Sequence, residues 1–115
     1  MIRRNGSYEG EVREKMRGGK GTVRVEHLWK KDELKGRTRL CARLTLEPGS
    51  SIGFHEHLNE AEVFVILSGE GKCLDGGVET LVRGGDTVLT GDGAGHAIEA
   101  VGTVPLVILA FIVQS

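Results

Sequence analysis

The feature of this sequence that most restricts its fold is a series of short β-type segments separated by glycine-containing turns. Residues 38–46 show the pattern most clearly, because Leu40, Ala42, Leu44 and Leu46 alternate with other residues and side chains two positions apart share one face of a strand. The chain has 18 glycines and 2 prolines in 115 residues, which indicates tight turns between β-rich runs. The pattern predicts an all-β protein, a sandwich or barrel of antiparallel strands.

Further segments of this kind predict strands and turns along the rest of the chain. The predicted strand 62–67 is apolar on both faces from Val63 to Leu67, which predicts cover on both sides of this strand. Asp75-Gly76-Gly77 predicts the turn of a hairpin, and we expect one helical turn at residues 31–34 and a tight loop at 90–95. Strands are predicted at residues 8–12, 22–29, 38–46, 62–67, 72–74, 78–82, 86–89, 96–101 and 103–113, with a further strand carrying the histidines that follow residue 50.

Length and charge limit the domain organisation and the partners. A chain of 115 residues has the size of one domain, and we expect an N-terminal arm at residues 1–21 followed by a single domain at residues 22–115. Basic and acidic residues are interleaved in the arm, which is typical of a solvated segment. The formal net charge of −1 gives no electrostatic basis for binding nucleic acid or an anionic membrane.

Cysteine usage and the chain start favour a cytoplasmic protein. Cys41 and Cys73 lie in predicted strands without metal-type spacing, so we expect buried free thiols in a reducing cytosol. No secretory signal is recognisable after Met1, and the apolar run 104–113 is about half of a bilayer-spanning helix, so it is expected to be a core strand. The glycine-rich segment 17–21 does not match a phosphate-binding loop, because that motif requires another glycine upstream.

Residues 49–69 carry the candidate chemistry. His55 and His57 are two positions apart and project together from a strand, so two imidazoles can bind one cation. Glu62 follows after a short loop and can supply a carboxylate oxygen, and His96 would join them from a distant strand. Three nitrogens and one carboxylate suit a divalent transition metal with open positions for water or substrate.

Neighbouring residues offer alternatives to this set. Glu60 lies in the loop and could replace Glu62 as the carboxylate ligand, although the start of the strand favours Glu62. Glu56 faces away from the histidines on a regular strand, and His27 is expected to be a surface or packed residue. The four polar residues could also be hydrogen-bonded groups in a barrel whose metal site has been lost, but burying them without a shared cation would be costly.

These residues resemble the two sequence motifs of the cupins. The first motif is matched at every spacing by Gly49, His55, His57, Glu62 and Gly69. The second is matched by Gly85, Gly93 and His96, while Gly91 replaces its proline and Ala100 its asparagine. The resemblance implies a double-stranded β-helix, or jelly roll, with the metal inside the barrel near one mouth. It also implies that His55, His57, Glu62 and His96 are the metal ligands and that the protein is a homodimer.

The resemblance further implies a metal-dependent enzyme acting on a small, oxygen-rich carboxylate, of the oxalate-decarboxylase, dioxygenase or isomerase type. A non-catalytic metal- or metabolite-binding module is the alternative, and a metal-free structural dimer is a third. The donor set favours Mn or Fe, with Ni and Zn as alternatives. No catalytic proton donor is identifiable. Arg39 or Arg43 could anchor a substrate carboxylate, but the alternation places both on the outer face of their strand.

A homodimer also follows from the apolar pattern. Val63, Val65 and Leu67 would face away from the site, and the segment 104–113 is apolar on both faces. An uncovered apolar surface of this kind favours aggregation unless a second subunit covers it.

Overall fold

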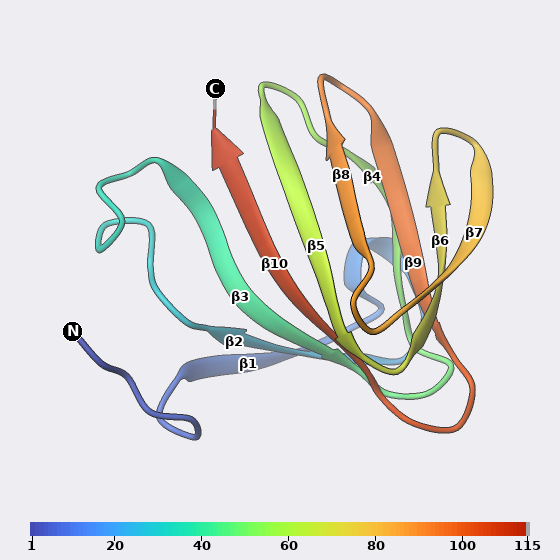
Figure 1. Ribbon diagram of the computed structural model, residues 1–115, viewed down its shortest axis with the longest axis horizontal. Coiled ribbons are helices and arrows are strands. Elements are labelled where there is room, and N and C mark those ends of the chain that lie inside the picture. The colour runs from blue at the N-terminus through green and yellow to red at the C-terminus, as the bar shows by residue number, and fades with distance from the viewer. Residues whose placement is uncertain (115) are drawn as a thin grey trace.

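The computed structural model describes residues 1–114, and over this range the protein is built almost wholly of strands (Figure 1). A single short 3-10 helix, η1, spans Met16–Gly18. The strands are β1 (Glu9–Glu14), β2 (Thr22–His27), β3 (Thr38–Leu46), β4 (Ser51–Glu56), β5 (Glu60–Ser68), β6 (Glu70–Asp75), β7 (Val78–Arg83), β8 (Thr87–Gly91), β9 (Gly95–Val101) and β10 (Leu106–Gln114).

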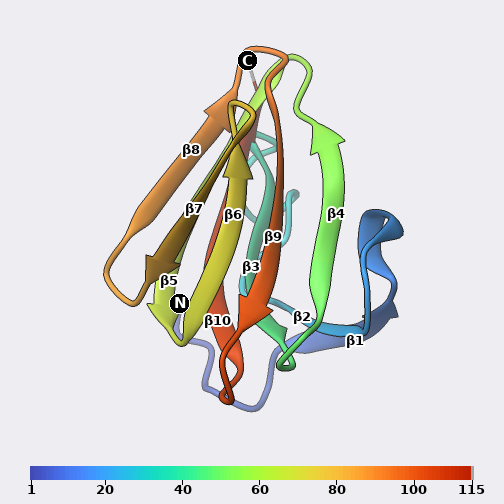
Figure 2. The same ribbon diagram turned by 90° about the vertical axis from the view of Figure 1, so that its right-hand side faces the viewer.

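Two antiparallel sheets face each other (Figure 2). The larger has the strand order β1-β2-β3-β10-β5-β8, and the smaller has the order β4-β9-β6-β7. Strands that are neighbours in the sheets are often distant in sequence, as in the pairing of β4 with β9 and of β3 with β10. This is the jelly-roll arrangement, so the predicted all-β, antiparallel double-stranded β-helix is confirmed.

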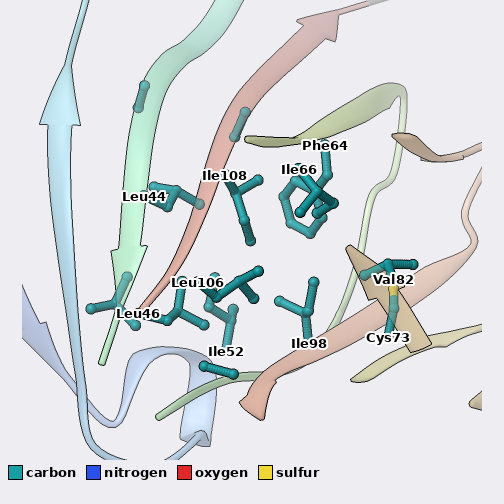
Figure 3. Close-up of a cluster of buried hydrophobic side chains, with 14 of the residues drawn as sticks. Leu44, Leu46, Ile52, Phe64, Ile66, Cys73, Val82, Ile98, Leu106 and Ile108 are labelled. Atoms are coloured by element: carbon teal, nitrogen blue, oxygen red, sulfur yellow. The ribbon is translucent and has the colours of Figure 1, made fainter. Parts of the chain in front are cut away.

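The hydrophobic core fills the space between the two sheets (Figure 3). In β5 the inward residues Phe64 and Ile66 are buried, whereas Val63 and Val65 on the opposite face are only half-buried. The predicted cover on both faces of this strand is therefore incomplete in the single chain. The largest buried apolar side chains are Leu44, Leu46, Ile52, Phe64, Ile66, Ile98, Leu106 and Ile108.

Most turns lie where glycines predicted them. The β6–β7 hairpin turns at Gly76 and Gly77, whose φ angles of 59° and 79° suit a primed turn that favours glycine at both positions. The last strand begins at Leu106 rather than at residue 103, because the chain first turns through Gly102 and then passes Pro105, which has no N–H to donate to a sheet.

Residues 1–21 contact the rest of the protein at several points. β1 pairs along its whole length with β2, so the strand expected at residues 8–12 is present at Glu9–Glu14. Arg3 forms hydrogen bonds of 2.8 and 3.1 Å with the Glu33 carboxylate, and its guanidinium lies 4.4 Å from the centre of the Trp29 ring. The division into an arm and a domain at residue 21 stays a prediction.

Cys41 and Cys73 are both buried and unpaired, which confirms the expected free thiols. Within residues 1–114, no helix is long and apolar enough to cross a membrane.

Candidate metal centre

The four predicted ligands converge at one point between the two sheets. His55 lies in β4 and His57 directly after it, while Glu62 comes from β5 and His96 from β9. One candidate ligand atom from each residue lies within 4.8 Å of the corresponding atom of every other. Glu62 and not Glu60 occupies the carboxylate position in this cluster, as the sequence favoured.

A bulge in β4 directs the histidines inward. Ile52 pairs with Ile98 and His55 pairs with His96, so three steps along β4 match only two steps along β9. The extra residue changes the alternation, which lets both Ile52 and His55 face the interior. The backbone N–H of His57 then donates to the carbonyl of Ala94 at 3.0 Å, which continues the pairing beyond the end of the strand. His55 and His57 therefore point to the same site, as predicted.

The imidazole Nε2 atoms form a compact group. The Nε2 atom of His96 lies 3.0 Å from that of His57 and 3.2 Å from that of His55. Glu62 Oε1 lies 2.9 Å from His57 Nε2, 3.0 Å from His96 Nε2 and 3.9 Å from His55 Nε2. Phe64 stacks on the His96 ring with centroids 4.7 Å apart, which fixes the plane of that imidazole.

Hydrogen bonds at the other ring nitrogen set the tautomers of two histidines. His55 Nδ1 donates to the carbonyl oxygen of Gly53 at 2.8 Å, and His57 Nδ1 donates to Glu60 Oε2 at 2.6 Å. Because both partners are acceptors, the proton resides on Nδ1 and the lone pair on Nε2. Both lone pairs point into the cluster, which is the arrangement that a metal-binding histidine requires.

This donor set fits a metal ion. Without a cation, lone-pair nitrogens and a carboxylate would face one another in a buried site, which is unfavourable. Nitrogens bound side by side to one ion at about 2.1 Å lie about 3 Å apart, as these nitrogens do. His96 Nδ1 is buried without a hydrogen-bond partner among the described residues, so this ring is held by packing and by its Nε2 contacts.

The histidines also keep Glu62 ionised. Burial of the carboxyl group opposes ionisation, but without a metal, hydrogen bonds from His55 and His96 in the form that carries a proton on Nε2 outweigh this effect and lower the pKa of Glu62 to about 2. A carboxylate that stays negative in a buried position is well suited to bind a cation.

A small cavity of about 80 Å³ leads to the site and is lined by three of the four residues, His55, His57 and Glu62. Apolar residues and three arginines line it. It is lined by Arg13, Met16, Arg17, Arg39, Leu40, Leu44, Ile52, His55, His57, Glu62, Phe64 and Ile112.

The expected position of Arg39 on the outer face of β3 was wrong. Pairing with β10 skips Arg39, because Ile112 lies opposite Leu40 and Val113 lies opposite Thr38. Such a bulge interrupts the alternation of faces, so Arg39 reaches the cavity. Arg43 lies on the outer face as predicted, where it contacts Glu26 at 3.0 Å.

Glu60 has a role that the sequence did not reveal. Its carboxylate accepts hydrogen bonds from His57 Nδ1 at 2.6 Å and from two nitrogens of Arg39 at 3.0 Å each. The Arg39 hydrogen bond, with a smaller contribution from His57, lowers the pKa of Glu60 despite partial burial. Glu60 therefore orients a candidate ligand rather than joining the set. A carboxylate three residues after a candidate metal histidine is the sequence signal that could have indicated this role.

The remaining histidine lies apart from the site. His27 ends β2 and is half-buried, with Nε2 3.5 Å from Glu11. It does not belong to the cluster of four candidate ligands, in agreement with its predicted surface or packing role.

Comparison with known proteins agrees with this geometry. The model of the Cupin domain family matches residues 42–112, which include all four candidate ligands. The chain belongs to the cupin family. The two residues that depart from the cupin motifs lie at closely packed positions. A Cβ atom at Gly91 would lie 2.9 Å from the Ala61 side chain, and Ala100 is buried in the core.

Two matches are close along the whole chain, and a third shares the fold alone. The chain is 41% identical over 113 residues to the oxalate-binding protein of Thermotoga maritima, covering 98% of this chain and 93% of that protein. A crystal structure described as a predicted oxalate decarboxylase from Thermotoga maritima has a TM-score of 0.97 at 40% identity, with full coverage of both chains. An RmlC-like cupin from Shewanella frigidimarina shares the fold, with a TM-score of 0.70 at 13% identity over 93% of this chain and 86% of that one.

Proposed function

We propose that this cupin binds a small, oxygen-rich carboxylate through one divalent transition metal held by His55, His57, Glu62 and His96. The observation that carries the proposal is the convergence of three imidazole nitrogens and one carboxylate oxygen at the end of a cavity that is also lined by arginines. Metal coordination would orient and polarise the ligand, and the guanidinium groups would favour its negative charge.

The donor set supports Mn or Fe(II) as the metal, with Ni and Zn as alternatives. Three nitrogens and one oxygen leave two positions free in six-coordination, and these metals accept such mixed ligands. Two free positions suit a ligand that chelates through two oxygens.

The ligand that these features favour is a dicarboxylate of the oxalate class. A cavity of about 80 Å³ suits a small ligand, and the relative from Thermotoga maritima is named for oxalate binding. The net charge of −1 again argues against nucleic acid or an anionic membrane as the partner.

Decarboxylation is the second candidate function, favoured by the likeness to a structure described as a predicted oxalate decarboxylase. In this reaction the C–C bond of oxalate breaks, CO₂ leaves, and the remaining carbon takes one proton to give formate. Among residues 1–114, the cavity lining contains no acidic side chain other than Glu62, which is a candidate ligand. The described structure therefore supports binding more directly than turnover.

Titration calorimetry with oxalate tests the proposal. We expect the Mn²⁺-loaded protein to bind oxalate, whereas the metal-free protein and the His55→Ala variant should not. An acetylacetone-type diketone and a sugar phosphate serve as comparison ligands. Formate production under the same conditions distinguishes an enzyme from a binding protein, and absence of metal-dependent oxalate binding would contradict the proposal.

We further infer a cytoplasmic homodimer. Two buried free thiols suit a reducing compartment. The outer face of β5 and β10 carries half-buried or exposed apolar residues that a second subunit could cover, namely Val63, Val65, Leu67, Val107, Leu109, Phe111 and Val113.

A further inference from the structure

We propose that Arg17, carried by the turn that follows β1, is the residue that selects a doubly charged ligand at the metal cavity. The inference rests on the proposed function, because it assigns one ligand contact at that same cavity. Arg17 lies outside residues 42–112, the part of the chain that matches the family model. Metal binding and selection of ligand charge would thus come from separate segments.

The turn that carries Arg17 is held against β4. η1 contacts β4, and the blue turn lies beside this strand in Figure 2. Met16 packs against the core and lines the cavity together with Arg17. The Arg17 carbonyl oxygen lies so close to Gly53 that a Cβ atom there would be 2.1 Å away. Two further hydrogen bonds, from Lys20 N to Ser51 Oγ at 2.9 Å and from Ser51 N to Lys20 O at 2.7 Å, fix the end of the turn.

The backbone of this turn is strained on both sides of Met16. Lys15 and Arg17 have φ angles of 50° and 54°, in the left-handed region that non-glycine residues rarely adopt. Such conformations persist only where the surrounding structure holds them, and they are concentrated at ligand-binding segments. Here they place Met16 and Arg17 at the cavity.

Arg17 differs from the other two arginines of the cavity in having an uncompensated charge. Arg39 is bound to Glu60 at 3.0 Å, and Arg13 Nε donates to Glu11 Oε1 at 3.0 Å. Within residues 1–114, the Arg17 guanidinium forms no side-chain hydrogen bond or ion pair. It is therefore free to bind a ligand, and its planar group matches a carboxylate with two parallel N–H···O contacts.

The metal positions and the free charge of Arg17 together favour a ligand with two negative charges. One end of a dicarboxylate would chelate at the free metal positions, and the negative charge that remains would be neutralised by Arg17. A ligand of the same size with an amide in place of one carboxylate loses this charge-assisted contact. We therefore expect preference for oxalate over oxamate, the monoanionic amide of the same shape.

Calorimetry with oxalate and oxamate tests the assignment on the Mn²⁺-loaded protein. Arg17→Gln should weaken oxalate binding about five- to tenfold and oxamate binding much less, in line with the loss of one charge-assisted hydrogen-bond pair. Arg17→Lys keeps the charge and should retain most of the preference. The matched control is Arg4→Gln, which removes the same charge from an exposed residue that does not line the cavity. Mn²⁺ affinity, measured with a competing chelator, should be the same in all four proteins.

The outcomes separate the two proposals. If the wild-type protein binds oxalate but Arg17→Gln has the same oxalate-to-oxamate ratio as Arg4→Gln, Arg17 does not select the ligand, and the proposed function stands. If the wild-type protein binds no oxalate with metal present, both proposals are overturned.

Discussion

The Glu60 carboxylate accepts a hydrogen bond from His57 Nδ1 at 2.6 Å and is itself held by Arg39. This contact fixes the tautomer and the ring orientation of His57, and a negative partner makes Nε2 a stronger donor to a cation. The geometry of the candidate metal site therefore depends on a residue that is not one of the four candidate ligands.

Glu60→Gln should weaken Mn²⁺ binding about tenfold or more, because the amide keeps the shape of the side chain but removes its charge. A competition titration with a chromophoric chelator measures the affinity. Glu56→Gln is the control, since Glu56 is adjacent to the site in sequence but exposed. Equal affinities of the Glu60→Gln and wild-type proteins would show that Glu60 does not support His57.

Metal binding should raise thermal stability, because the four ligands are assembled only in the folded state. At a metal concentration a thousandfold above Kd the gain is about 4 kcal/mol, which corresponds to more than about 10 °C in Tm for a domain of this size. Calorimetry before and after dialysis against EDTA measures the change. His55→Ala should lose most of this gain, and a melting temperature insensitive to both metal and EDTA would contradict the assignment.

The buried Glu26 should make stability depend on acidic pH. Its hydrogen bonds with Arg43 outweigh burial and lower its pKa below the usual 4.5. The stabilisation is thus present above about pH 4.5 and is lost as the pH falls through the lowered pKa. Glu26→Gln should cost about 1–3 kcal/mol at pH 7, and the difference from wild type should shrink below pH 4.5.

Urea unfolding of the metal-free proteins between pH 3 and 7 measures this difference. Glu79→Gln, at an exposed position of β7, is the control and should change stability little. A cost of Glu26→Gln that is as large at pH 3 as at pH 7 would show that the ion pair is not the cause.

The apolar outer face of β5 and β10 should form the dimer interface. Leu109 and Val65 lie opposite each other there, so a lysine at position 109 would bury a charge between subunits. Light scattering should show a dimer for the wild type and a monomer for Leu109→Lys. Val78→Lys changes an exposed apolar residue of the other sheet and should leave the dimer intact. A monomeric wild type at micromolar concentration would contradict the prediction.

Local pattern was enough to predict most of the strands and to bring His55, His57 and Glu62 together, whereas His96 was predicted from its match to the second cupin motif. The alternation in residues 38–46 and the glycines at the turns are signals that lie within a few residues of the chain. The spacing of His55, His57 and Glu62 can likewise be interpreted from the geometry of a strand. The start of the last strand and the partial exposure of Val63 and Val65 were less predictable, because they depend on which strands lie beside them.

The sequence by itself determined the all-β architecture, through short-range periodicity, and the identity of the four candidate ligands, through residue spacing and the resemblance to the cupin motifs. Only the tertiary structure decided how the site is completed. The bulges in β3 and β4 are set by the register against β10 and β9; they bring Arg39 to the cavity and turn His55 inward. The placement of Arg17 at the cavity depends on the contact of its turn with Gly53, 36 positions along the chain. Long-range pairing of this kind leaves no periodic signal in the sequence.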